Sequence, residues 1–292
     1  ADIIVNPNRQ LYEDNYPFAS ISGSMVIWKL MQYYAALYTN EFCQLAVNDL
    51  FVFAGLSTIS DVMPLDDENR TIVQFTCQYL SDQQWLLDHV FNKVYPTHFR
   101  LCFLGFLSLL DVFRTKKKMS DQITYTDLGF YLSPILNTPR RIEDSSERAF
   151  RLFNIDAFMT DVQSSAIMPI DSEFTLFLLE ADLQAKYNML CEENEYMFLA
   201  VSACLCHAKQ LFLLNENRKR ILDHCCQKVM GEFQSYDMDE LIYHTVVKAP
   251  VTHGLVGLIA GKLMNKYALP FIVFGDRNQS VMSASARSPE GI

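Results

Sequence analysis

The segment GLSTISDVMPLDDENR, residues 55–70, carries the pattern around which the rest of the chain is organised. It follows an apolar, helix-length segment at 45–54, and the small residues at 55–58 predict a turn. Pro64 closes the segment, and the acidic residues 66–68 precede an apolar periodic run. Because the free N–H groups and the dipole of a helix N-terminus favour negative charge, these acids predict the start of a helix.

Asp61 has no comparable structural explanation, because it lies between the apolar residues Ile59 and Val62. A carboxylate in an apolar setting is usually paired or coordinates a metal ion. From the residues alone, two interpretations stay open. Either Asp61 binds a metal, or its side chain hydrogen-bonds the predicted turn at 55–58.

Segment 55–70 resembles the aspartate motif of RecJ-like single-strand exonucleases, members of the DHH phosphoesterase superfamily. The resemblance implies that Asp61 is a catalytic residue that helps to bind Mn²⁺ or Mg²⁺. Residues 6–32, NPNRQLYEDNYPFASISGSMVIWKLMQ, resemble the part of RecJ that follows its histidine-pair motif. We therefore expect a piece of a longer protein, with most metal ligands before Ala1 and the terminal Gly-Gly-His motif after Ile292.

The composition limits the classes of protein that fit this chain. With 292 residues, half of them hydrophobic, the chain can bury a sizeable core in about two domains. Its net charge of −10 argues against broad, non-specific coating of nucleic acid, which depends on neutralising phosphates. The eight cysteines fit a reducing cytoplasm. The most apolar run, residues 99–113, is interrupted by charged residues, so we predict a buried helix and no membrane partner.

Helices should dominate the fold. Apolar periodicity predicts a helix from Phe18 onward, capped by a serine at 20 or 22, and further helices at 67–80, 84–94 and 98–113. Residues 3–5 read as a short buried strand. The basic run at 114–118 predicts a solvated turn, with a nucleic-acid contact as the alternative.

Residues 123–144, ITYTDLGFYLSPILNTPRRIED, resemble the "G-F, then P-x-L-N, then Arg" motif of RecJ. The resemblance implies that Asn137 and Arg141 line the substrate path. An arginine suits this role, because its guanidinium grips a phosphate through two hydrogen bonds. Pro139 and Arg140 stand where the family has Ala-Gly, so either arginine is a candidate. In the alternative interpretation, these residues cap a helix near Ser145 and both arginines face solvent.

Residues 155–210 have no recognised counterpart in the family. Cysteines and histidines in and after this segment suggest a zinc site, although buried helical cysteines are the preferred interpretation: Cys204, Cys206, His207, His224, Cys225 and Cys226. Residues 214–230 predict an amphipathic helix that resembles RecJ's connector, with residues 218–220 on its solvated face. Residues 241–247 predict a strand.

Residues 252–274 predict a loop with paired glycines, a helix and a strand. Gly254 and Gly257 would let the backbone approach a ligand, and a helix N-terminus favours phosphate, although a plain strand-loop-helix turn is the alternative. The segment resembles the start of the DHH-associated domain, which implies that His253 and Gly254 contact substrate. SASARSPEG at 283–291 resembles the family's G-S-G-R-S segment, which implies phosphate contacts by Ser285 and Arg287.

Together these matches predict a helix-rich α/β fold in three parts: the C-terminal part of a DHH domain at 1–150, a helical connector at 151–232, and the start of a DHH-associated domain at 233–292. The implied function is metal-dependent 5′-to-3′ degradation of single-stranded DNA in repair or recombination, with replication or repair proteins as further partners. Asp61, Arg141, Ser285 and Arg287 are expected to converge on one cleft. We expect this chain alone to be inactive. The alternatives are a non-catalytic RecJ-like binding protein and a DHH phosphodiesterase for short oligonucleotides.

Overall fold

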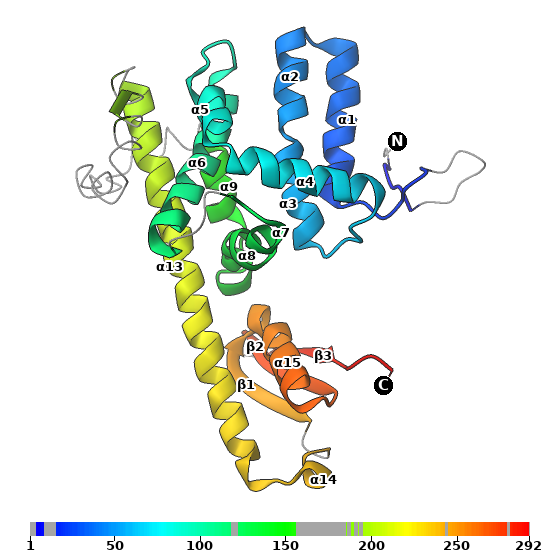
Figure 1. Ribbon diagram of the computed structural model, residues 1–292. Coiled ribbons are helices and arrows are strands. Elements are labelled where there is room, and N and C mark those ends of the chain that lie inside the picture. The colour runs from blue at the N-terminus through cyan, green and yellow to red at the C-terminus, as the bar shows by residue number, and fades with distance from the viewer. Residues whose placement is uncertain are drawn as a thin grey trace. The chain divides into compact units, whose positions relative to one another are not determined.

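The computed structural model describes residues 4–8, 16–117, 122–155, 185, 188–189, 192, 195–242, 245–278 and 281–291. These residues form a helix-rich α/β fold with a three-stranded sheet (Figure 1), which confirms the predicted dominance of helices. The chain divides into two compact units. The first contains residues 1–136 and 149–210, and the second contains 137–148 and 211–292. Arg141 is thereby grouped with the sheet, whereas the predicted division placed it in the first domain.

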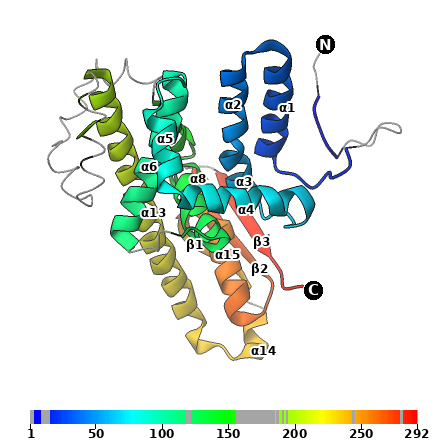
Figure 2. The same cartoon turned by 45° about the horizontal axis from the view of Figure 1, so that its top comes forward.

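The first unit is built from helices. In chain order they are α1 (Gly23–Tyr38), α2 (Glu41–Asp49), α3 (Phe51–Ser60), α4 (Asp67–Ser81), α5 (Gln83–Phe91), α6 (Thr97–Lys117), α7 (Tyr125–Asp127), the π-helix η1 (Leu128–Leu132), the start of α8 (Ser133–Ile142), α9 (Glu147–Phe153) and the start of α13 (Glu195–Glu232). Helices α1 and α2 lie side by side as a hairpin (Figures 1 and 2).

Local sequence explains where several of these helices begin. The Ser22 hydroxyl accepts a hydrogen bond from the Met25 N–H at 3.3 Å and caps α1, as predicted. Asp66 occupies the N-cap position of α4, and two acids fill its first turn, so the predicted acidic helix start is confirmed. Helices α4, α5 and α6 confirm the three helices predicted between residues 67 and 113.

Three local predictions were wrong. Residues 55–58 belong to helix α3 and form no turn. A Cβ atom on Gly55 would lie 2.0 Å from Thr76 Oγ1, so this glycine permits close packing of α3 against α4. Ile4 and Val5 are exposed and irregular, and Ile3 lies outside the described residues. Residues 114–117 continue helix α6, and Lys118 is outside the described residues.

Two helical segments are long and apolar enough to cross a membrane by length and composition, Cys43–Ser60 and Tyr196–Glu232. The core helix of a soluble protein meets the same criteria, and half of the Tyr196–Glu232 window is buried inside the protein. The first segment is interrupted, because α2 ends at Asp49 and α3 begins at Phe51. Length and composition are therefore weak evidence that either segment spans a membrane.

The second unit joins the end of α8 and the C-terminal half of α13 to a small sheet. The other elements are the 3₁₀ turn η3 (Phe233–Ser235), α14 (Met238–Leu241), β1 (Val246–Thr252), α15 (His253–Tyr267), β2 (Phe271–Asn278) and β3 (Val281–Arg287). Strand β1 pairs parallel with β2, and β2 pairs antiparallel with β3. The strand predicted at 241–247 begins only at Val246, because Leu241 still belongs to α14.

The sheet has one covered and one open face, because successive side chains of a strand point to opposite sides. Buried odd-numbered strand residues pack with apolar residues of α13 and α15 in a single core: Ala249, Val251, Phe271, Val273, Leu222, Cys226, Val229, Leu255, Ile259 and Leu263. The even-numbered residues Val246, Ile272 and Met282 are exposed on the other face. This alternation decides which β3 side chains face α15.

Candidate nucleic-acid interface

Ser285 and Arg287 lie on the face of β3 that is turned toward α15. A Cβ atom placed on Gly257 of α15 would lie 3.2 Å from Ser285 Oγ and 3.3 Å from Arg287 Nη2. Arg287 is exposed, and its Nη1 donates to Ser285 Oγ at 3.1 Å and to the Ala286 carbonyl at 2.7 Å. Gly257 therefore lets a hydroxyl and a guanidinium, both of which can donate to an anion, lie close to the α15 backbone.

Gly254 brings the start of α15 against the end of α8. A Cβ atom on Gly254 would lie 2.1 Å from the Arg141 carbonyl oxygen. The Thr252 hydroxyl lies 3.5 Å from that same oxygen. The close approach that this glycine allows is thus to the protein's own backbone. A substrate contact by Gly254 stays a prediction.

Asn137 and Arg141 are four residues apart on α8, so both side chains project from one face of the helix. Arg141 is half-buried, and among the described residues its guanidinium makes no hydrogen bond or ion pair. Burial lowers the pKa of Arg141 below its ordinary value, yet an arginine stays charged. A half-buried cation without a partner favours binding of an anion.

Arg140, unlike Arg141, is paired with a carboxylate, and this distinguishes the two candidate arginines. Its Nη1 donates to the Asp144 carbonyl at 2.6 Å and pairs with the Asp144 carboxylate. His253 Nε2 lies 3.5 Å from the same carboxylate. The Asp144 carboxylate thus pairs with Arg140 and lies within ion-pair distance of His253, and it does not pair with Arg141.

Asp61 lies at the C-terminal end of α3, in the first unit. The Met63 N–H donates to the Thr58 carbonyl at 3.0 Å and the Val62 N–H to the Ile59 carbonyl at 3.2 Å. This is a Schellman motif, in which Val62 has φ +56° at the position that usually carries glycine. The exposed Asp61 carboxylate accepts a hydrogen bond from Ser57 Oγ at 3.1 Å, and no Lys or Arg among the described residues pairs with it.

A divalent metal ion needs several oxygen or nitrogen ligands around one point. The described residues contain no group of three or more His, Cys, Asp or Glu side chains that would hold an ion. Asp61 therefore supplies one exposed carboxylate, which already accepts the hydrogen bond from Ser57 that the alternative interpretation predicted, and the described part of the chain does not by itself fit a divalent metal. Its role as a metal ligand stays a prediction.

Three of the cysteines considered as zinc ligands lie in apolar surroundings. Cys204 is fully buried, and Cys225 and Cys226 belong to the core of the second unit. Burial raises the pKa of Cys204, and to about 12 that of Cys102. Thiols held in the neutral form are poor metal ligands, since coordination needs the thiolate.

Arg218 is the residue whose environment was predicted wrongly. It was placed on the solvated face of α13, but only 8% of it is exposed. Its Nε and Nη2 both donate to Asn215 Oδ1, at 3.1 and 2.9 Å. The available signal was the i, i+3 spacing of Asn215 and Arg218, which places an amide beside the guanidinium on one helix face.

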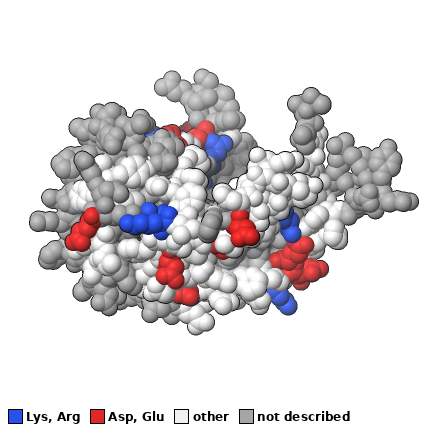
Figure 3. Space-filling model, turned by 90° about the horizontal axis from the view of Figure 1, so that it is seen from above, with Lys and Arg blue, Asp and Glu red and all other residues white. Residues whose placement is uncertain are grey.

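Figure 3 shows the charged side chains of one face of the molecule. On that face, lysines and arginines of the described residues stand singly near acidic side chains, without a basic stripe. The interface suggested by the second unit is built on a few groups that include Arg141 and Arg287.

Comparison with known proteins gives a consistent relationship. The single-stranded-DNA-specific exonuclease RecJ of Haemophilus influenzae is 26% identical to this chain, covering 100% of the chain and 41% of the relative. RecJ of Bacillus subtilis is 24% identical, covering 94% of the chain and 26% of the relative. No family model matches. The chain is a distant homologue of the RecJ exonucleases. It spans less than half the length of these relatives.

Solved structures agree at the level of the fold. RecJ of Thermus thermophilus with Mg²⁺ superposes with a TM-score of 0.51 at 15% identity, covering 92% of this chain and 30% of that one. An exonuclease RecJ bound to manganese gives 0.51 at 14% identity, covering 92% of this chain and 48% of that one. The resemblance predicted from the ordered motifs is thus confirmed, and the helix-rich α/β fold matches part of RecJ.

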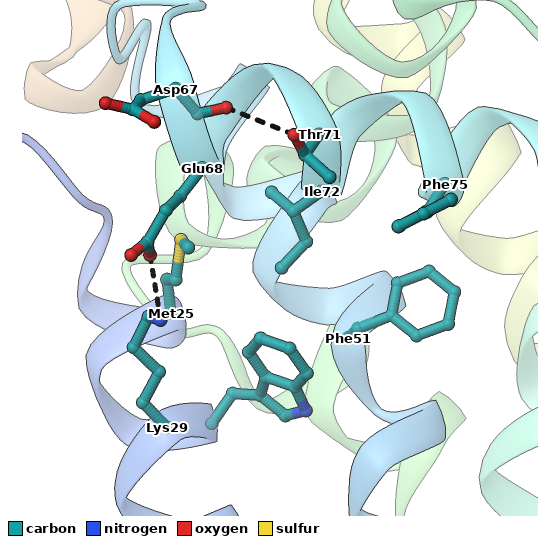
Figure 4. A pocket seen from close by; sticks show the side chains of 9 residues that line it. Met25, Lys29, Phe51, Asp67, Glu68, Thr71, Ile72 and Phe75 are labelled. Atoms are coloured by element: carbon teal, nitrogen blue, oxygen red, sulfur yellow. Dashed lines mark hydrogen bonds and ion pairs between the residues drawn. The ribbon is translucent and has the colours of Figure 1, made fainter.

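A second feature is a hollow in the first unit, lined in part by residues of the segments 6–32 and 55–70. Its volume is about 360 Å³, and it lies between α1, α3 and α4 (Figure 4), with an apolar lining of Met25, Trp28, Phe51, Ile72 and Phe75. At its edge, Lys29 Nζ pairs with Glu68 at 2.8 Å, and the Tyr16 hydroxyl donates to the same carboxylate. Burial lowers the pKa of Lys29, but hydrogen bonds to Glu68 and Tyr16 outweigh it and raise that pKa overall. The hollow therefore carries a neutralised pair at its rim and no free charge at Lys29.

Proposed function

We propose that this chain is part of a single-stranded-DNA-specific 5′-to-3′ exonuclease of DNA repair or recombination, and that its second unit binds the DNA strand. The observation that carries the proposal is the half-buried Arg141 guanidinium, which no described residue pairs, together with Ser285 and Arg287 beside Gly257. The homology to RecJ over the whole of this chain supports the same class of substrate.

The proposed roles follow the chemistry of each group. Arg141 and Arg287 bind phosphates, and the Ser285 hydroxyl and Asn137 amide donate to neighbouring oxygens. His253 and Gly254 border the strand at the start of α15. In domain terms, the first unit corresponds to the C-terminal part of a DHH domain, and the sheet with α15 to the start of a DHH-associated domain.

We further propose Mn²⁺ or Mg²⁺ as cofactor of the whole protein, since relatives were crystallised with these ions. Such ions activate water and stabilise a leaving oxygen. Asp61 would supply one ligand, and the others would come from residues outside those described. The proposed location is the cytoplasm, with replication or repair proteins as further partners.

The binding test compares arginines that differ in environment. Arg141→Ala and Arg287→Ala should each weaken binding of a fluorescent oligothymidylate, measured by anisotropy. Each should also flatten the dependence of log K on log salt by about 0.7, the value for one phosphate contact with a single strand. Arg220→Ala, which changes an exposed arginine of α13, is the matched control and should leave both unchanged. Equal binding by all three variants would remove the proposed strand contact.

The catalytic test uses the full-length protein. Asp61→Ala should abolish Mn²⁺-dependent degradation of single-stranded DNA and leave single-strand binding largely intact. Asp66→Ala, which removes a nearby exposed carboxylate, is the control and should retain activity. Blunt double-stranded DNA should be a poor substrate. If the unmodified protein binds single strands but degrades none with either metal, it is a non-catalytic RecJ-like binding protein.

A further inference from the structure

Arg218 is a buried cation whose guanidinium donates to a side-chain amide in place of a carboxylate. Two of its nitrogens donate to Asn215 Oδ1, and the Thr138 hydroxyl donates to that same oxygen at 3.1 Å. No ion pair of Arg218 occurs within the described residues. A neutral amide satisfies the hydrogen bonds of the guanidinium but leaves its charge uncompensated.

The contact between Thr138 and Asn215 joins the two helices that carry Arg141 and Arg218, α8 and α13, within the second unit. Arg141 follows Thr138 by three residues on α8, and Arg218 follows Asn215 by three residues on α13. Residues three apart on a helix are neighbours on its surface, so each arginine lies one turn from the shared contact.

Acidic residues close to these two arginines in sequence pair with other cations. Glu216 pairs with Lys219 at 2.8 Å, Asp223 with Lys262 at 2.6 Å, and Asp144 with Arg140. Burial first, and then the like charge of Arg141, lower the pKa of Arg218; the charges of Glu216 and Asp223 raise it by less, so the pKa stays below its ordinary value. Two neighbouring guanidiniums thus repel each other in a poorly solvated place, and a bound anion would relieve that repulsion.

We propose that Arg218 is a positioning residue for the phosphate that Arg141 contacts, supplying a second positive charge that Asn215 and Thr138 hold in place. The site takes a phosphate or similar oxyanion. That this phosphate belongs to single-stranded DNA rests on the proposed function; the anion site itself does not.

The first test removes the charge with the least change in shape. Arg218→Met should raise the Kd for oligothymidylate about tenfold, equivalent to about 1.4 kcal/mol. Its thermal midpoint should stay equal or rise, because the variant also removes a buried like charge. Arg220→Met, at an exposed position of the same helix, should change neither value. A purely structural role predicts the opposite pattern, a lower midpoint with affinity retained.

The second test keeps Arg218 and compensates its positive charge with a neighbouring carboxylate. Asn215→Asp has nearly the same shape and places a carboxylate on both guanidinium donors, so the folded chain should be as stable or more stable. Its affinity for oligothymidylate should fall as in Arg218→Met. This variant keeps the proposal falsifiable if Arg218→Met does not fold, because Asn215→Asp with unchanged affinity would overturn it.

The third measurement uses inorganic phosphate as the probe. Phosphate should raise the thermal midpoint of the unmodified chain more than chloride at equal ionic strength. This difference should disappear in Arg218→Met, Asn215→Asp and Arg141→Met and persist in Arg220→Met. Phosphate stabilisation without binding of single strands would refute the proposed function but support this inference. Strand binding that none of the Arg218 and Asn215 variants weakens would refute this inference alone.

Discussion

At the scale of single residues, Gly254 is required by the contact between α15 and α8. Gly254→Ala places a Cβ atom 2.1 Å from the Arg141 carbonyl oxygen and 2.7 Å from its carbonyl carbon, both backbone atoms that cannot turn aside. We expect a loss of about 1–3 kcal/mol in the free energy of unfolding, the usual range for overpacking. Urea denaturation measures it.

Gly261 provides the matched control on the same helix. A Cβ atom there meets nothing within 4 Å, so Gly261→Ala should be neutral or stabilise α15 by up to about 1 kcal/mol. If both substitutions have the same effect, the close approach at Gly254 is not what restricts this position.

The environment of a side chain could be predicted where it depends on residues close by in the sequence. The i, i+4 spacing of Asn137 and Arg141 was visible in the sequence, and α8 does place both on one face. The choice between Arg140 and Arg141 was not visible, because it depends on where Asp144 lies. Arg218 was misjudged because a run of three basic residues suggests a solvated face, although its i, i+3 spacing from Asn215 on the same helix was visible in the sequence.

At the scale of elements, His89 ties α5 to the end of α2. Its Nδ1 lies 2.7 Å from the Trp85 carbonyl and its Nε2 lies 2.9 Å from Asp49 Oδ2. The Trp85 carbonyl and the Asp49 carboxylate are both hydrogen-bond acceptors, so each ring nitrogen of His89 contacts an acceptor. The ring also stacks on Tyr95, with centroids 5.3 Å apart and planes 12° apart.

We expect His89→Phe to keep the aromatic packing and to lose the bond to Asp49. The cost should be about 1.5–3 kcal/mol, the range for hydrogen bonds to charged groups. Thermal or urea unfolding measures the loss. His98→Phe, at an exposed histidine of α6, is the control and should change stability little. A stable His89→Phe protein would show that packing, not the bond to Asp49, holds α5.

Periodicity predicted the existence of α4, α5 and α6, because each has a regular apolar face. It failed at the end of α3 for two physical reasons. Gly55 looked like a turn residue, yet it is a contact point between helices that only the neighbour's position explains. The true end of α3 carries Val62 where glycine is usual, so the stop signal was missing from the sequence.

At the scale of the whole molecule, the order of the RecJ motifs along the chain was the strongest sequence signal, and the homology over the whole chain confirms it. The division into units was harder to foresee. Residues 137–148 cluster with the sheet although more than sixty residues separate them from α13's second half in sequence. Such a grouping depends on tertiary contacts such as Thr138 to Asn215, which spacing alone does not reveal.

Thiol reactivity gives a prediction for the molecule as a whole. Burial raises the pKa of Cys102 to about 12 and, together with the charge of Asp127, that of Cys77 to about 11, from the ordinary 9.0. At pH 8 both thiols should alkylate slowly in the folded chain and quickly in urea, as read by mass spectrometry. Alkylation of Cys77 should accelerate as the pH rises toward 11.

The same shifts give the sign of an effect on stability. A raised folded pKa means that the stabilisation is complete below the ordinary thiol pKa of 9.0 and is lost as the pH rises through the folded values near 11 and 12. The chain should therefore lose stability in alkali above pH 9. Equal alkylation rates in the folded chain and in urea would contradict the burial of these thiols.

Val62 ends α3 in a left-handed conformation that costs a β-branched residue about 1–2 kcal/mol. Glycine would remove this strain, but it would also widen the ensemble of the unfolded chain, at a cost of about 0.5–1 kcal/mol. Val62→Gly should thus gain little, whereas Val62→Asn, which tolerates this conformation with fewer unfolded states than glycine, should gain more. Both gains would come from strain relieved in the folded chain, whereas the difference between the two variants would come from the conformational entropy of the unfolded chain, at the residue next to Asp61.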